Sequence, residues 1–317
     1  KQLGAYGVQV ILDYGVEAKE GEENFDNVTE KIMEALAFAA TQNNIPFVSI
    51  KLTGIASLQL LETLNEAPRL RSGIHDSEIE DAAWERVKER MYAICDLASE
   101  KGVGILLDAE ETWIQDPIDR LAIELMAEYN KKKVVVYNTY QLYRNDRLHF
   151  LQLSHKIAKE KNFKLGAKLV RGAYMEKENL RAEEKGYPTP ICESKEATDL
   201  NYDAAIHYMV ENIDKMAIFA GTHNELSSYK LMEYLQELNI EKKDSRIWFG
   251  QLYGMSDNIS YNLAANRFNV AKYLPFGPVK DVMPYLIRRA EENTSVAGQT
   301  SRELSMLKAE RNRRKAL

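Results

Sequence analysis

Short apolar runs alternate with helical patterns along almost the whole of this chain, and this alternation limits the folds that it can adopt. Most of the runs lack the apolar–polar alternation of a half-exposed sheet, as expected for parallel strands covered on both faces. The expected strands are Val8–Tyr14, Phe47–Thr53, Gly104–Glu110, Lys133–Tyr140, Lys164–Arg171, Met216–Thr222, Ile247–Leu252 and Asn269–Leu274. Eight βα units favour an α/β fold of the (β/α)8 barrel type, as one domain over residues 1–317. A doubly wound sheet is the rival fold, but its usual glycine-rich first turn is missing here.

Helical patterns fill the connections between these strands. They cover Val28–Thr41, Ile55–Asn65, Asp76–Ser99, Ile118–Asn130, Asp146–Lys161, Thr198–Asn212, Glu225–Leu238 and Asp257–Asn266. Start signals support two of them, Asp116 with Pro117 before one and Ser256 before another. Two successive helical patterns after the second strand predict a helical insertion over residues 55–101. The basic stretch 301–317 predicts a further helix, packed on the barrel or, as the alternative, in contact with a membrane surface.

The composition narrows the class of protein. A formal net charge of −6 argues against nucleic acid as the main partner. No apolar run approaches the roughly 20 residues that span a bilayer, and no signal peptide is visible. The chain starts without Met, so a targeting segment could have been lost upstream. Cys95 and Cys192 lack metal-ligand spacing and are interpreted as reduced thiols of a cytoplasmic type of protein.

Candidate site residues follow the carboxyl ends of the strands, where the chemistry of such barrels takes place. They are Asp13, Glu17, Lys51, Thr53, Asp108, Glu110, Glu111, Asn138, Tyr140, Gln141, Lys168, Arg171, Tyr174, Thr222, His223, Asn224, Gln251, Leu252, Tyr253 and Tyr273. Structural ion pairs are an alternative interpretation of Lys51 and Lys168. The cations at one mouth of an acidic protein nevertheless predict an anionic ligand, one with phosphates and a carboxylate. Metal binding is not expected, because these cations compete and His223 is the only strand-end histidine.

A helical pattern over Asp281–Asn293 adds a second set of polar groups. At about 100° per residue, Tyr285, Arg288, Arg289 and Glu292 fall on one narrow face. Guanidinium groups match the planar fork of a carboxylate, so the arginine pair predicts a carboxylate clamp. A solvated helix face is the alternative interpretation.

Several segments together resemble the proline dehydrogenase family. The segment Lys164–Tyr174 resembles its fifth-strand signature and Gly221-Thr-His-Asn224 its sixth-strand flavin motif. Gln251-Leu-Tyr-Gly-Met255 and the Tyr273–Asn293 block, with its Tyr-x-x-Arg-Arg core, also match. Leu12–Glu17 and Val48–Lys51 fit the family as well, and all of these segments arrive in its order. Many members have Arg where Lys168 stands and Gln where Asn138 stands. Lys and Asn at these positions also occur in the branch of the family nearer the eukaryotic enzymes.

The resemblance implies a (β/α)8 barrel that holds FAD at its mouth, with the last helix lying over that mouth. Lys51, Arg288 and Arg289 would grip the substrate carboxylate. Leu252, Tyr273 and Tyr285 would pack around its ring, with Asp108 beneath as a catalytic support and Lys168 beside the flavin N5 edge as the second catalytic residue. The implied cofactor residues are Ala109, Asn138, Arg171, Gly172, Ala173, Thr222, His223, Asn224 and Glu292. Glu17 would pair with the second arginine as a gate.

The implied reaction oxidises L-proline to Δ1-pyrroline-5-carboxylate, the first step of proline catabolism to glutamate, with hydride transfer to flavin N5. Electrons would then pass to a quinone at the membrane surface, and pyrroline-5-carboxylate dehydrogenase is a candidate partner. The expected location is the cytoplasm, with peripheral contact at the inner membrane, or the mitochondrion for a eukaryotic chain. Three alternatives remain: a hydroxyproline dehydrogenase, which Tyr273 disfavours, a Schiff-base aldolase using Lys51 or Lys168, and a non-catalytic amino-acid-binding barrel.

Overall fold

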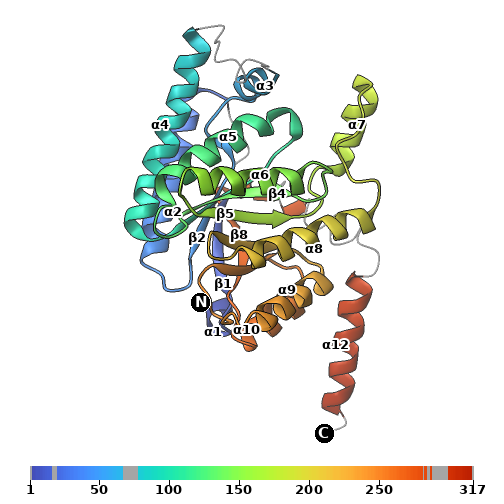
Figure 1. Cartoon of the computed structure of the whole chain (residues 1–317). Coiled ribbons are helices and arrows are strands. Elements are labelled where there is room, and N and C mark those ends of the chain that lie inside the picture. Colours follow the sequence, from blue (N-terminus) through green and yellow to red (C-terminus); the bar gives the residue numbers. More distant parts are fainter. Residues whose placement is uncertain are drawn as a thin grey trace.

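The computed structural model describes residues 2–15, 20–66, 78–280, 282–283, 286–287 and 299–315. In these residues eight parallel strands close into a barrel (Figure 1). The strands are β1 (Gln9–Tyr14), β2 (Phe47–Ile50), β3 (Gly104–Leu107), β4 (Val136–Gln141), β5 (Leu165–Val170), β6 (Met216–Gly221), β7 (Ile247–Leu252) and β8 (Val270–Phe276). Each strand pairs with the next in the chain, and β8 pairs with β1 from Gln9 to Tyr14. The predicted (β/α)8 barrel is therefore confirmed.

Helices lie around the barrel. They are α1 (Gln2–Ala5), α2 (Glu22–Ala40), α3 (Leu58–Glu66), α4 (Glu78–Lys101), α5 (Thr112–Tyr129), α6 (Arg147–Glu160), α7 (Met175–Lys185), α8 (Lys195–Glu211), α9 (Glu225–Glu237), α10 (Asp257–Ala265) and α12 (Gln299–Lys315), with a short 3-10 turn η1 (Leu52–Gly54). All of these helices except α1 and α7 correspond to helical segments expected from the sequence. The expected insertion is present as α3 and α4, which pack against α5 and α2. It does not interrupt the sheet, because β2 and β3 pair directly.

The structure corrects two predicted helix starts. Pro117 does not begin its helix, because α5 starts at Thr112 and contains Pro117 in its interior. The Thr112 amide and hydroxyl both donate to the Glu178 carboxylate at 2.7 Å, which stabilises the earlier start. Ser256 precedes α10 as predicted, but its side chain does not cap the helix. Its hydroxyl instead lies 2.9 Å from His223 Nδ1.

Aromatic rings fill the interior of the barrel below its carboxyl-terminal mouth, toward the amino-terminal ends of the strands. The Phe47 ring meets those of Tyr137, Phe219 and Trp248 edge-on, at centroid distances of 5.5, 5.6 and 5.0 Å. Inward-facing glycines make room for two of these rings. A Cβ on Gly104 would lie 2.4 Å from the Phe47 ring, and a Cβ on Gly250 would lie 2.2 Å from the Phe219 ring. This packed layer closes the barrel below, so any ligand must enter at the opposite, carboxyl-terminal mouth.

Helices α7 and α12 stand away from the ring of helices (Figure 1). Helix α7 was not predicted, because its sequence has no apolar face and buries only Glu178 and Ala182. For α12 the helix is confirmed, but packing on the barrel is not. Its side chains from residue 305 to 315 are exposed apart from the half-buried Glu310.

Candidate functional site

The side chains of Asp108, Lys168 and Tyr273 meet at the mouth of the barrel. Tyr273 on β8 belongs to the cluster inside the barrel, and Lys168 on β5 reaches its hydroxyl, so both side chains face inward above the aromatic layer. Their neighbours in each strand point to the outer face. Lys168 Nζ donates to the Tyr273 hydroxyl at 2.7 Å and also to Asp108 Oδ1. It lies 4.9 Å from the centroid of the Tyr273 ring. Three strands far apart in sequence thus place an acid, a cation and a phenol in contact.

Burial makes the charges in this cluster depend on one another. The side chains of Lys168 and Asp108 are only 6% and 15% exposed. Such a pair is stable only when its charges and hydrogen bonds are satisfied, because desolvation is costly. Tyr273 contributes the extra hydrogen bond, and its hydroxyl lies 3.4 Å from Asp108 Oδ1. The cluster therefore offers a fixed positive charge and a polarised phenol to a ligand above it.

Lys51 follows β2 at the same end of the barrel and is half-buried. Within the part of the chain that the structure describes, it makes no hydrogen bond or ion pair. The nearby Glu110 carboxylate accepts from the Thr53 amide at 3.1 Å and hydroxyl at 2.6 Å. Burial raises the pKa of Glu110, and the charge of Lys51 opposes that rise. A cation in this position suits a small carboxylate.

A second cluster surrounds Arg171, which follows β5. The guanidinium donates to the Thr222 and Ser227 hydroxyls at 2.7 and 2.6 Å, and its Nε lies 2.9 Å from Asp199. It stacks on the Tyr202 ring at 3.7 Å. These contacts fix a cation beside β6, although Asp199 offsets part of its charge.

The neighbouring predicted residues border this cluster. Gly172 and Ala173 are exposed, and Gly172 has a φ of +52°, which favours glycine. Asn224 caps α9, because its side-chain oxygen accepts the amides of Leu226 and Ser227 at 2.9 and 3.3 Å. Thr222 is buried and its hydroxyl accepts the Asn224 amide. Polar groups after β5 and β6 are therefore gathered at one side of the mouth.

Asn138, one of the predicted cofactor residues, is placed differently, whereas Ala109 leaves its backbone available as predicted. Asn138 is fully buried, and its side-chain amide donates at 2.8 Å to Asp119 on α5. It therefore lies on the outer face of the barrel, where it joins β4 to the surrounding helices. Its role at a cofactor stays a prediction, and these contacts favour a structural one. The side chain of Ala109 is buried after β3, so only its backbone could contribute.

Comparisons with known proteins place this fold and these residues in one family. The family model described as proline dehydrogenase matches residues 1–302. The chain belongs to the proline dehydrogenase family. This family is flavin-dependent, and its members are oxidoreductases.

Several named relatives are similar to this chain over most of its length. The carbapenem antibiotics biosynthesis protein CarD of Pectobacterium carotovorum is 35% identical over 313 residues, which cover 98% of this chain and 79% of that protein. Mitochondrial proline dehydrogenase 1 of Homo sapiens is 39% identical over 241 residues, covering 75% of this chain and 40% of that enzyme. A hydroxyproline dehydrogenase of Xenopus laevis is 31% identical.

Among solved structures, proline utilization A of Bdellovibrio bacteriovorus, inactivated by N-propargylglycine, superposes with a TM-score of 0.81 at 25% identity. The match covers 93% of this chain and 31% of that one. The chain thus spans less than half of the human enzyme and about a third of proline utilization A.

Five predicted site residues of this proline dehydrogenase family member lie outside the described residues. They are Glu17, Tyr285, Arg288, Arg289 and Glu292. The predicted last helix over the mouth depends on the same segment. The carboxylate clamp and the gate therefore stay predictions.

Sequence reasoning missed the residues that hold the predicted ones in place. Asp199, Asp203 and Ser227 surround Arg171 but belong to α8 and α9, not to strand ends. Lys272 is buried beside Tyr273 and bonds the loop after β7. The sequence signal for Lys272 was a single charged residue within the otherwise uncharged strand β8. No local pattern identifies the helix residues.

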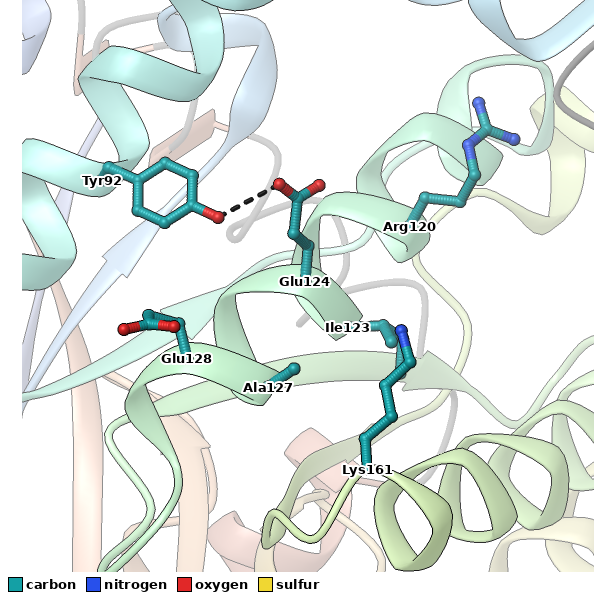
Figure 2. A pocket seen from close by; sticks show the side chains of 7 residues that line it. All are labelled: Tyr92, Arg120, Ile123, Glu124, Ala127, Glu128 and Lys161. Carbon is teal, nitrogen blue, oxygen red and sulfur yellow. Dashed lines mark hydrogen bonds between the residues drawn. The ribbon is translucent and has the colours of Figure 1, made fainter. Parts of the chain in front are cut away.

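A separate pocket lies outside the barrel, away from these clusters. It has a volume of about 500 Å³ and lies between α4, α5 and Lys161 after α6 (Figure 2). Tyr92 donates to Glu124 across it at 3.0 Å. None of its lining residues is a predicted site residue.

Two further observations concern metals and membranes. The described residues contain no group of three or more His, Cys, Asp or Glu side chains that could hold a metal ion. Among the helices that the structure describes, none has the length and apolar content needed to cross a bilayer.

Proposed function

We propose that this chain oxidises L-proline to Δ1-pyrroline-5-carboxylate at the mouth of its barrel, with FAD as the resident cofactor. The observation that carries the proposal is the Asp108–Lys168–Tyr273 cluster in a member of the proline dehydrogenase family. The half-buried Lys51 lies after a neighbouring strand and supplies a cation for the substrate carboxylate. Arg288 and Arg289 would complete this carboxylate site, and Tyr285 and Leu252 would border the substrate ring.

The donor set supports FAD rather than a smaller group. Lys168 offers an ammonium group at the centre of the mouth, where the polar edge of a flavin ring needs donors. Arg171, with Thr222, His223 and Asn224, lies to one side and suits the phosphates of a dinucleotide. Gly172 and Ala173 leave the backbone after β5 accessible, and Glu292 would add a polar contact. A bound flavin supplies the hydride acceptor that the side chains of the protein lack.

The residues of the chain would act by holding the substrate and setting its charge. Charge-assisted bonds from a lysine or arginine to a carboxylate contribute about 1.5–3 kcal/mol each. Fixing the ring over the cofactor contributes more, because orientation removes most of the entropic barrier. The amine must be neutral when hydride leaves, and no described residue is an obvious base. We therefore expect the amine to bind deprotonated or to lose its proton to water, and kcat/KM should rise with pH between about 6 and 10. A flat profile would contradict this.

Anaerobic titration with L-proline tests the proposed function directly. Purified protein should show a flavin absorption spectrum that bleaches as L-proline is added. A colourless protein that cannot take up FAD would exclude the proposal. Glu17→Ala should change proline affinity or the rate of bleaching if Glu17 gates the site, and an unchanged variant would remove the gate.

Hydroxyproline oxidation is the second candidate, because a relative named hydroxyproline dehydrogenase matches the chain. Tyr273 argues against it, since the family resemblance associates this tyrosine with proline rather than hydroxyproline as substrate, and its bond to Lys168 holds it at the mouth. Comparing bleaching by the two substrates separates the candidates. A Schiff-base aldolase is less well supported, because Lys168 is ion-paired with Asp108, and borohydride trapping tests it.

The electron acceptor and the location are also proposals. We expect a quinone at a membrane surface, and pyrroline-5-carboxylate dehydrogenase as the enzyme that takes the product. The similarity to proline utilization A supports the dehydrogenase partner, and the similarity to a mitochondrial enzyme supports the mitochondrial location. The chain would then lie in the cytoplasm or, in a eukaryote, in the mitochondrion, with peripheral contact at the inner membrane. Reoxidation by vesicles with and without quinone tests the acceptor.

A further inference from the structure

Lys272 is a fully buried lysine that the proposed chemistry does not use. It precedes Tyr273 on β8, so the two side chains point to opposite faces of the barrel. Tyr273 faces the mouth, while Lys272 faces outward toward α10 and is 0% exposed. Lysine is almost never buried to this extent unless it is paired. Its partners therefore indicate what it does.

Three hydrogen-bond partners of Lys272 lie in one loop. Lys272 Nζ donates to the Met255 carbonyl at 2.7 Å and to Asp257 Oδ1 at 2.5 Å, and lies 3.5 Å from the Leu252 carbonyl. The residues from Leu252 to Asp257 connect β7 with α10. One ammonium group thus bonds the beginning, the middle and the end of this connection, which we call the β7–α10 loop.

The β7–α10 loop needs such support because its backbone is not relaxed. Ser256 has a φ of +52°, which a residue with a side chain rarely adopts, whereas Gly254, with a φ of +80°, adopts such a conformation without strain. Left-handed conformations of this kind persist only where surrounding contacts hold them. Lys272 provides the charged contacts, and the Tyr253 amide adds a backbone bond to the Tyr273 carbonyl at 3.0 Å.

The same loop touches both halves of the candidate site. Leu252 packs against the inward-facing cluster that contains Tyr273, at the predicted substrate wall. The Ser256 hydroxyl lies 2.9 Å from Nδ1 of His223, a predicted cofactor residue. A shift of the loop would therefore move a wall of the substrate site and the orientation of the histidine together.

We propose that Lys272 is a positioning residue, which holds the β7–α10 loop from outside the barrel so that Leu252 and His223 keep their places at the mouth. The proposal rests on the proposed function for its effect on turnover. The hold on the loop itself does not depend on that function. A neutral side chain of similar length would leave two carbonyls and a carboxylate without their donor.

Lys272→Met in the FAD-loaded protein tests this inference. We expect kcat/KM for L-proline to fall about 10- to 100-fold, mostly through KM, because Lys272 touches no reacting atom. We also expect faster hydrogen exchange of the Tyr253 and Met255 amides, measured without substrate. The matched control is Arg246→Met, which removes the ion pair with Asp244 at the opposite end of β7. It should lower the thermal midpoint and leave kcat/KM and the exchange of the loop amides unchanged.

The outcomes separate the two proposals. Unchanged exchange of the loop amides in Lys272→Met, or faster exchange with unchanged kcat/KM, overturns the positioning role. A wild-type protein whose flavin does not bleach with L-proline overturns the proposed function, and the exchange measurement still decides whether Lys272 holds the loop. Should Lys272→Met not fold, Asp257→Asn keeps the lysine and its carbonyl bonds. It should give smaller changes in the same direction, and an unchanged Asp257→Asn would overturn the inference.

Discussion

Asp108 and Lys168 illustrate how much a single residue of this site depends on its neighbour. Each side chain is largely buried, and each supplies the countercharge of the other. Asp108→Asn would leave a buried ammonium without a full countercharge and should destabilise the fold by about 3–5 kcal/mol. Lys168→Met in the same chain should recover part of this loss, because the unpaired charge is removed. Chemical denaturation of the two single variants and the double variant measures the coupling, and additive effects would show that the pair is not coupled.

Lys51 should affect binding far more than stability. Because it makes no hydrogen bond or ion pair within the described residues, Lys51→Met leaves no direct partner unsatisfied there, although the buried Glu110 carboxylate loses a favourable charge. We expect KM for L-proline to rise about tenfold or more, consistent with the loss of about 1.5–3 kcal/mol of charge-assisted bonding. Steady-state kinetics measures it. Lys177→Met, which removes an exposed cation paired with Glu111, is the control and should leave KM unchanged. Equal KM values for both variants would remove Lys51 from the carboxylate site.

At the scale of elements, the contact between α6 and α8 contains a pH-sensitive group. His155 is buried, its Nδ1 lies 2.7 Å from the Tyr208 hydroxyl, and burial lowers its pKa to about 4, with Lys159 adding to the effect. In the unfolded chain the pKa of His155 is near 6.5. Below that pH the unfolded chain therefore binds a proton at His155 that the folded chain does not bind. Stability should therefore fall as the pH drops from about 6.5 to about 4, by roughly 3 kcal/mol.

Thermal or urea unfolding across this pH range measures the loss. His155→Gln can keep the hydrogen bond to Tyr208 and has no titrating ring, so its stability should change less between these pH values. The paired carboxylates Asp146, Asp199 and Asp244 have lowered pKa values, so their contribution is lost at lower pH. A wild-type curve parallel to that of His155→Gln would show that His155 does not titrate in this range.

The barrel layers limit which glycines can be replaced. Gly250 on β7 faces the Phe219 ring so closely that an added methyl group would overlap it. Gly250→Ala should therefore destabilise the fold by about 1–3 kcal/mol, through forced movement of the ring. Gly186, where an added Cβ would have nothing within 4 Å, also has a φ of +71°, so Gly186→Ala tests backbone strain without overlap. Denaturation of both variants compares the two costs, and a Gly250→Ala variant as stable as the wild type would show that the layer can relax.

At the scale of the whole molecule, the sequence predicts the order of the strands better than the details between them. Each strand is a short apolar run that differs clearly from its flanks, so all eight appear where expected. Helix α7 has no apolar stripe, because it projects from the barrel and is held by Glu178. The early start of α5 also depends on Glu178, 66 residues later in the chain, which no local pattern can reveal.

The site shows the same limit. The rule that chemistry follows strand ends brings together Asp108, Lys168 and Tyr273, because the barrel closes β8 onto β1. It does not predict the contact of Asn138 with Asp119, since β4 is buried along its whole length and its sequence does not reveal which residues face inward. The contacts of Lys272 depend on a loop conformation that only the folded chain defines.

The exposure of α12 has a consequence for the stability of the whole molecule. Met306 and Leu307 are 44% and 68% exposed, and the basic residues that follow are exposed as well. Burial of apolar area stabilises a fold by about 25 cal/mol per Å², so a helix that buries so little contributes little. Shortening the chain after residue 298 should therefore leave the thermal midpoint within about 2 °C of the wild type. Bleaching by L-proline should persist, because the clusters at the mouth are intact. Calorimetry and anaerobic titration check both, and a large fall in the midpoint would show that α12 packs on the barrel in solution, as the sequence had suggested.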